Sequence, residues 1–204
     1  MTVFKGDIMD YIDYPKIDES AEYDAFIGGI EPGGLRNRNE IKILVCYILK
    51  TIDGKITKQQ INEVMQGQGL ANYFEVNQAI SELLSQGSID CEYIDEDEAL
   101  TITERGRQVV FELEHDLPRS VREKAIKSAI KILTIAKNAQ ENKIEVTPLE
   151  NGFHVTFTIE DEQDVMMKLT IFVADREQAD SVKKNFLEDP TRVYSSILSS
   201  LMVE

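Results

Sequence analysis

The sequence of 204 residues is 42% hydrophobic and 29% charged, which is typical of globular proteins and unlike disordered or fibrous chains. A chain of this length can form one large domain or two small ones. No stretch approaches the roughly 18 apolar residues that a membrane span requires. The 37 acidic residues outnumber the 22 basic ones and give a net charge of −15. Because phosphate repels such a protein, nucleic-acid binding would require basic residues gathered on one face.

The cysteine content and the first residues bear on the cellular compartment. Cys46 and Cys91 lie within apolar patterns, at a spacing that does not suggest a metal site. We therefore expect two buried thiols in a reducing compartment. Residues 1–10 contain one lysine and no apolar run typical of a secretory signal. These features predict a cytoplasmic protein without membrane association.

Residues 1–35 form an acidic N-terminal arm with eight acidic and two basic residues. Its apolar residues follow no sustained period, and glycines and prolines interrupt them. Two interpretations stay open: a flexible tail, or an arm whose aromatic residues dock in a groove of the same or a partner chain. The apolar residues of the arm are Phe4, Ile8, Tyr11, Ile12, Tyr14, Ile17, Tyr23 and Phe26.

Residues 36–117 open with three predicted helices. The first runs from about Arg38 to the Asp53-Gly54 pair. Thr57 and Gln60 form a capping-box signature for the second. The third, over 73–85, has a cap formed by Asn72 with Glu75. The apolar face of the first helix comprises Ile41, Leu44, Val45, Ile48, Leu49 and Ile52.

A two-stranded hairpin is predicted next, because apolar residues alternate on both sides of an acidic turn at 95–98. Thr103 caps a fourth helix that ends before Pro118. Helix, helix, turn, helix, hairpin and helix is the order of a winged helix. In that fold, helix 73–85 would enter a DNA groove, and hairpin 88–103 would be the wing.

Residues 118–204 are predicted to form a small α+β domain that could mediate dimerisation. Ser120 and Glu123 suggest the cap of a helix that reaches about Gln140 and is apolar on two sides. Such a helix needs two partners: a sheet, and either the first domain or a second copy of the chain. Three antiparallel strands follow, over 144–147, 153–160 and 165–173, and then two helices. In the last helix we expect four buried residues: Val193, Ile197, Leu198 and Leu201.

Three segments together resemble a known bacterial family. They are the run from Gly33 to Leu49, the stretch from Gly69 to Val76, and the string Leu-Thr-Ile-Thr-Glu-Arg-Gly at 100–106. From about residue 33 to the C-terminus the chain resembles domain of unknown function 4364. The resemblance implies a winged-helix, transcription-regulator-like fold. It implies no ligand, catalytic residue or cofactor.

No catalytic, cofactor or metal site is predicted, and we expect a non-enzymatic protein. His115 and His154 have no nucleophile or carboxylate at an activating distance in the sequence. The acidic run at 95–98 lacks the alternate spacing and the glycine of a calcium loop. We expect it to be a solvated turn.

The first functional hypothesis is a dimeric transcriptional regulator. Asn77, Gln78 and Ser81 lie on the predicted outer side of helix 73–85 and could read base edges. This helix carries no lysine or arginine, and the hairpin tip is acidic. Contacts to phosphate would come from Arg36, Arg38, Lys55, Lys58, Arg105 and Arg107.

The second hypothesis is a winged-helix module that has lost DNA binding and engages a basic protein partner. The partner would then meet the acidic residues Asp95, Glu96, Asp97 and Glu98 and the acidic arm. A contiguous stripe formed by the six basic residues would favour DNA, whereas scattered positions would favour protein. A small-molecule pocket in the second domain is a third possibility, although its apolar pattern needs only core packing.

Overall fold

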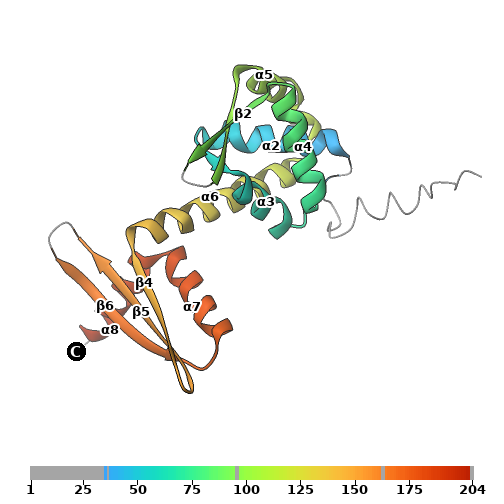
Figure 1. Ribbon diagram of the computed structural model, residues 1–204. Helices are drawn as coiled ribbons and strands as arrows, with labels where there is room; N and C mark the ends of the chain where they lie inside the picture. Colours follow the sequence, from blue (N-terminus) through green and yellow to red (C-terminus); the bar gives the residue numbers. More distant parts are fainter. Residues whose placement is uncertain (1–34, 36, 95–96, 162–163, 203–204) are drawn as a thin grey trace, which may run out of the picture.

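The structure, a computed structural model, describes residues 35, 37–94, 97–161 and 164–202. Its helices accompany two separate three-stranded antiparallel sheets, so the predicted α+β class is confirmed. Figure 1 shows the two sheets far apart, with one long helix, α6 (Arg119–Glu141), running from the region of the first towards the second.

Helix α2 (Arg38–Ile52) lies at the centre of the first core. It begins at Asn37, whose side chain accepts a hydrogen bond from the Glu40 amide, and ends at Asp53 in the left-handed conformation. Helices α4, α5 and α6 all pack against it. Because it is surrounded in this way, α2 buries more than the one predicted face: Ile41, Ile43, Leu44, Val45, Cys46, Ile48 and Leu49.

The predicted second and third helices are α3 (Lys58–Gly67) and α4 (Tyr73–Ser85), and their predicted caps are confirmed. Thr57 and Gln60 form the reciprocal capping box, and Asn72 accepts from the Glu75 amide. A short strand that was not predicted, β1 (Ile56–Thr57), precedes α3 and joins the hairpin.

The hairpin consists of β2 (Ile89–Ile94) and β3 (Asp97–Ile102), and the sheet order is β1-β3-β2. Strand β2 is therefore an edge strand, and Ile89 is its only buried residue. The prediction that Cys91 is buried is wrong, because this edge projects from the core and the thiol is exposed. Asp97 and Glu98, predicted in the turn, belong to β3 and pair with Ile94 and Tyr93.

Helix α5 (Glu104–Leu113) packs closely on the base of the hairpin. Thr103 caps it as predicted and also donates to the Gly87 and Ser88 carbonyls. A Cβ atom at Gly106 would lie 2.1 Å from the Ser88 carbonyl oxygen. The glycine in the 100–106 string is therefore required by the approach of helix to strand. A 3-10 turn, η1 (Glu114–Asp116), leads from α5 towards α6.

Helix α6 is shared between the two cores. Val121, Ala125 and Ala129 in its first half belong to the first core, and Ile135 packs against the second. The predicted two-sided packing thus has its second partner within the same chain. The predicted cap at Ser120 is wrong, because Pro118 precedes the helix and no side chain caps it.

The second sheet has the predicted meander order β4-β5-β6, formed by β4 (Lys143–Leu149), β5 (Gly152–Glu160) and β6 (Val165–Val173). Helix α7 (Arg176–Glu188) covers one face, and the Phe157 and Phe186 ring centroids lie 4.5 Å apart. The side chain of Asp189 caps α8 (Pro190–Leu201) by accepting a hydrogen bond from the Arg192 amide. The predicted burial of α8 is wrong, because little of the sheet lies against it: Val193 and Ile197 are half-buried, and Leu198 and Leu201 are exposed.

Candidate functional site

A groove of about 650 Å³ lies between α3, α4 and the hairpin, where the predicted DNA-binding surface was placed. Residues from all three elements line it, among them Lys58 and Asn62 of α3, Asn77 of α4, and Tyr93 of the hairpin. We refer to α4, β2, β3 and this groove together as the α4–hairpin surface.

The three predicted base-reading residues lie on the outer side of α4, but all three side chains bond within the protein. The Asn77 Nδ2 atom donates to the Tyr73 carbonyl at 2.7 Å and to Asn62 Oδ1 at 3.2 Å. The Ser81 hydroxyl donates to the Asn77 carbonyl at 3.0 Å. Gln78 is exposed and bonds to Glu82. Of the three, Asn77 would have to break its amide pair to reach a base.

Arg38 lies on one flank of α4 and contacts two acidic residues there. Its Nε atom is 3.0 Å from Glu75 Oε2, and its NH1 atom is 3.6 Å from Glu82 Oε1. Lys42 adds a contact of 3.1 Å to Glu82. The hydrogen bond from Lys42 is the main cause that lowers the pKa of the Glu82 carboxyl. The cations on this flank therefore neutralise acids of α4.

Lys55 and Lys58 lie on the opposite flank, beside the hairpin. Lys55 pairs with Glu92 of β2, and Lys58 Nζ is 2.8 Å from Glu98 Oε2 of β3. The hydrogen bond between Lys58 and Glu98 raises the pKa of Lys58 and lowers the pKa of Glu98. Both lysines, which were predicted to contact DNA phosphate, therefore pair with acids of the hairpin.

The remaining predicted phosphate contacts are the three arginines Arg107, Arg105 and Arg36. Arg107 pairs with Asp53 at the end of α2. Arg105 is exposed and has no ion-pair partner within the described residues. Arg36 lies outside the described residues. Of the five predicted cations that the structure describes, four pair with acids: Arg38, Lys55, Lys58 and Arg107.

Acidic residues dominate the α4–hairpin surface. Within the described residues of α4, β2 and β3 there is no lysine or arginine, and six acids are present: Glu75, Glu82, Asp90, Glu92, Asp97 and Glu98. Of the predicted partner-binding acids, Asp97 and Glu98 are therefore on this surface. Asp95 and Glu96 lie outside the described residues.

Exposed aromatic side chains are the feature that the sequence interpretation missed. Phe74 at the start of α4 is 80% exposed, and Tyr93 of β2 is 75% exposed. Tyr73 and Ile94 beside them are also exposed. The signal was present in the sequence, because Tyr73 and Phe74 precede the apolar stripe of α4. Four exposed apolar side chains among acids form a surface suited to binding.

Groups that could perform other chemistry are dispersed in the described part of the chain. His115 is exposed beside α5, and His154 lies on the outer face of β5 with its ring against Phe172. No cluster of three histidine, cysteine or acidic residues that could hold a metal occurs among the described residues. Similarly, none of the helices described combines the length and the apolar character needed to cross a membrane.

Comparison with known proteins gives one match. The model of the family described as Domain of unknown function (DUF4364) matches residues 41–201, which includes both cores except Leu35. The chain belongs to this family. No curated protein and no solved structure matches it. The matched range begins within α2, so the acidic arm lies outside the part that this DUF4364 member shares with its family model.

Proposed function

We propose that this DUF4364 protein is a winged-helix interaction module whose α4–hairpin surface binds a basic protein segment instead of DNA. The order of α2, α3, α4, hairpin and α5 supports the winged-helix assignment. The observation that carries the proposal is the charge of α4 and the hairpin: they hold six acids and no described lysine or arginine. Cations of neighbouring elements in the described part of the chain pair with only four of the six. A DNA duplex approaching this surface would meet like charge.

The aromatic residues define the chemistry of the partner further. Tyr73, Phe74 and Tyr93 are exposed, and the Tyr93 hydroxyl lies 3.4 Å from Glu98 Oε1. Lysine and arginine side chains bind to aromatic rings through cation–π contacts and to carboxylates through ion pairs. Asp90 and Asp97 are exposed and have no ion-pair partner among the described residues, so they are available to a partner. A segment that alternates arginine or lysine with apolar residues fits this combination.

Fluorescence anisotropy with two probes tests the proposal. A labelled arginine- and lysine-rich peptide should bind at about 50 mM salt, where phosphate contacts would also be strongest. A labelled DNA duplex should show no binding at the same salt concentration. Binding of the duplex that weakens steeply with salt, without binding of the peptide, would contradict the proposal.

A DNA-binding transcriptional regulator is the second candidate. The exposed polar side of α4 favours it, because Gln78 and Ser81 could approach base edges. Surface ion pairs contribute only about 0–1 kcal/mol each, so phosphate could displace the acids paired with Lys55 and Lys58. Binding of DNA fragments from the source organism that is lost in Gln78→Ala and Lys58→Ala variants would support this candidate.

We further propose that the C-terminal part joins two copies of the chain. The supporting observation is the exposed apolar side of α8, where Leu201 is 78% exposed, together with Met202 just after the helix, which is 73% exposed. Burial of such side chains between two copies would stabilise a dimer. Helix α6 does not support the dimer, because its two apolar sides pack against the first and second cores of the same chain.

A further inference from the structure

A second groove, of about 810 Å³, lies where α3 faces α6 and α7. It adjoins the groove of the α4–hairpin surface, and five residues line both: Thr57, Gln59, Glu63, Gln66 and Asp97. Its α6 wall is apolar and is formed by Ile132, Ile135, Ala136 and Ala139. We call it the α3–α6 groove.

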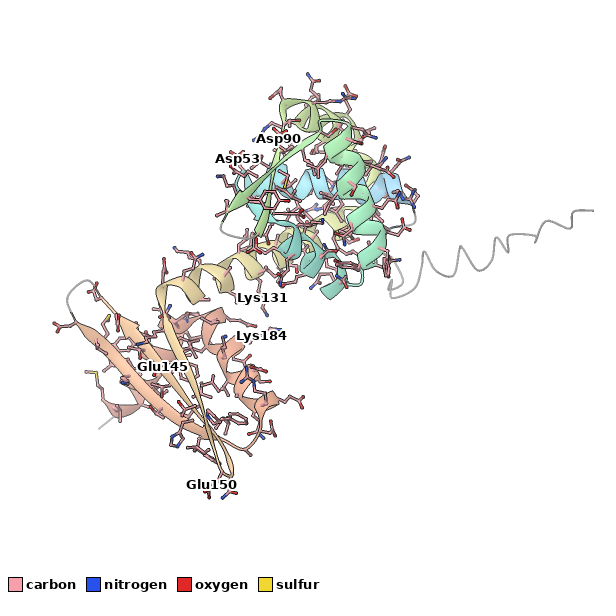
Figure 2. The ribbon with its side chains drawn as sticks, viewed as in Figure 1. Asp53, Asp90, Lys131, Glu145, Glu150 and Lys184 are labelled. Atoms are coloured by element: carbon pink, nitrogen blue, oxygen red, sulfur yellow. The ribbon has the colours of Figure 1, made fainter. Side chains whose placement is uncertain are left out.

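The charges on the α6–α7 side of this groove are positive. Lys131 of α6 and Lys184 of α7 line it, and Figure 2 shows both at the junction of the two cores. Lys131 contacts Glu188 at 2.7 Å, whereas Lys184 has no ion-pair partner within the described residues. Helix α6 as a whole has six basic and two acidic residues, a net charge of +4 in a protein of net charge −15. The opposite wall carries Glu63 and Asp97 among several glutamines.

The N-terminal arm enters the described structure beside this groove. Leu35 is buried, and its amide donates to the Leu70 carbonyl at 3.0 Å. Leu70 is two residues from Gln68, which lines the groove and whose carbonyl accepts from Lys124 of α6. The arm therefore starts at the end of the groove where α3 stops.

The composition of the arm complements the groove. Residues 17–27, Ile-Asp-Glu-Ser-Ala-Glu-Tyr-Asp-Ala-Phe-Ile, carry four acids and four large apolar side chains. Seven residues separate this segment from Leu35 and span up to roughly 25 Å when extended. The α6 wall from Ser128 to Ala139 is about 17 Å long. The segment can thus reach and follow the whole groove.

We propose that residues 17–27 of the arm dock in the α3–α6 groove of their own chain. The aromatic side chains Tyr23 and Phe26 cover the apolar wall of α6, and the carboxylates face Lys131 and Lys184. Docking fills the space between the first core and α7, so the arm holds the two cores at a fixed separation.

Paramagnetic relaxation enhancement in the full chain tests this inference. A nitroxide on Ser20→Cys, in a Cys91→Ser background, should reduce the amide signals of Glu63 and Ala136 by more than half. The signal of Glu150, at the far turn of the second sheet, should keep its intensity. Cys46 is buried and takes no label. Equal effects on the three amides would overturn the proposal.

Two sets of variants separate docking from chance proximity. Tyr23→Ser with Phe26→Ser should restore the signals of Glu63 and Ala136, and these changes lie outside both cores. Lys131→Glu with Lys184→Glu should also restore them. Lys127→Glu with Lys183→Glu, exposed lysines of the same helices that do not line the groove, should leave the effect intact. Isotope-labelled chains without a nitroxide, mixed with spin-labelled chains, should keep the signals of Glu63 and Ala136. Loss of these signals in the mixture would place the arm on a second copy and overturn the proposal.

Discussion

The Nζ atom of Lys58 lies 2.8 Å from Oε2 of Glu98, which ties the first turn of α3 to the second strand of the hairpin. The sequence suggested a lysine available to phosphate and an acid available to a partner. In the structure, Lys58 and Glu98 instead pair with each other. The contact also fixes the hairpin beside α3, and so shapes the groove in which Tyr73 and Asn77 lie.

This pair predicts the titration of Glu98. The hydrogen bond lowers the folded-state pKa of Glu98 below its ordinary value of 4.5, so its stabilising effect is present above pH 4.5 and is lost as pH falls through the lowered value. In a Lys58→Met variant the midpoint should rise towards 4.5, as measured by carboxyl NMR. Lys55→Met is the control: it removes a nearby cation that pairs with Glu92, and the titration midpoint of Glu98 should not change. The same midpoint in Lys58→Met and in the unaltered chain would show that the contact does not form in solution.

Gly106 should be intolerant of any side chain. A Cβ atom there would lie 2.1 Å from the Ser88 carbonyl oxygen and 2.9 Å from Ile102 Cγ1. We expect Gly106→Ala to reduce the free energy of unfolding by about 1–3 kcal/mol in urea titrations. Gly67→Ala at the end of α3 is the matched control, since no atom lies within 4 Å of its Cβ position. Equal stability of the two variants would contradict the close packing of α5 on the hairpin.

The two thiols should differ in reactivity. Cys91 is exposed, whereas burial raises the pKa of Cys46 to about 12. A colorimetric thiol reagent at pH 8 should therefore modify one thiol per native chain and two after unfolding. Cys91→Ser should show no rapid reaction. Rapid modification of two thiols in the native chain would contradict the position of Cys46 within α2.

Self-association should depend on α8. Light scattering at micromolar concentration should give twice the chain mass of 23.2 kDa. Leu198→Ser with Leu201→Ser should return it to the single-chain mass, because these residues form the exposed apolar side of α8. Ile130→Ser, at an exposed position on α6, is the control and should leave the mass of the dimer unchanged. A single-chain mass for the unaltered protein would exclude the dimer.

Local features of the fold could be predicted from the sequence. The capping box at Thr57, the caps at Asn72 and Thr103, and the alternation in β5 and β6 depend on residues a few positions apart. The false cap at Ser120 shows the limit of such signals. Pro118 holds the cap position and Arg119 is the first helical residue, so the helix begins two residues earlier than the cap signature at Ser120 indicates.

Features that join distant residues could not be predicted in this way. The pairs Arg38–Glu75 and Lys50–Glu114 join residues 37 and 64 positions apart, and no periodicity reveals them. For the same reason the sequence showed that α6 needs two partners but not that both belong to one chain. The exposure of Cys91 and α8 likewise depends on what the fold leaves uncovered.

The affinity of a charge-reduced variant for a basic peptide tests the central claim most directly. Asp90→Asn with Asp97→Asn removes two unpaired acids from the hairpin, and anisotropy should show about three- to tenfold weaker binding of the arginine- and lysine-rich peptide. Glu150→Gln with Glu160→Gln removes the same charge from the second sheet; Figure 2 shows Glu150 at the opposite end of the molecule from Asp90. This control should bind as the unaltered chain does. Equal weakening by both variants, or no weakening by either, would contradict recognition of a basic partner by the α4–hairpin surface.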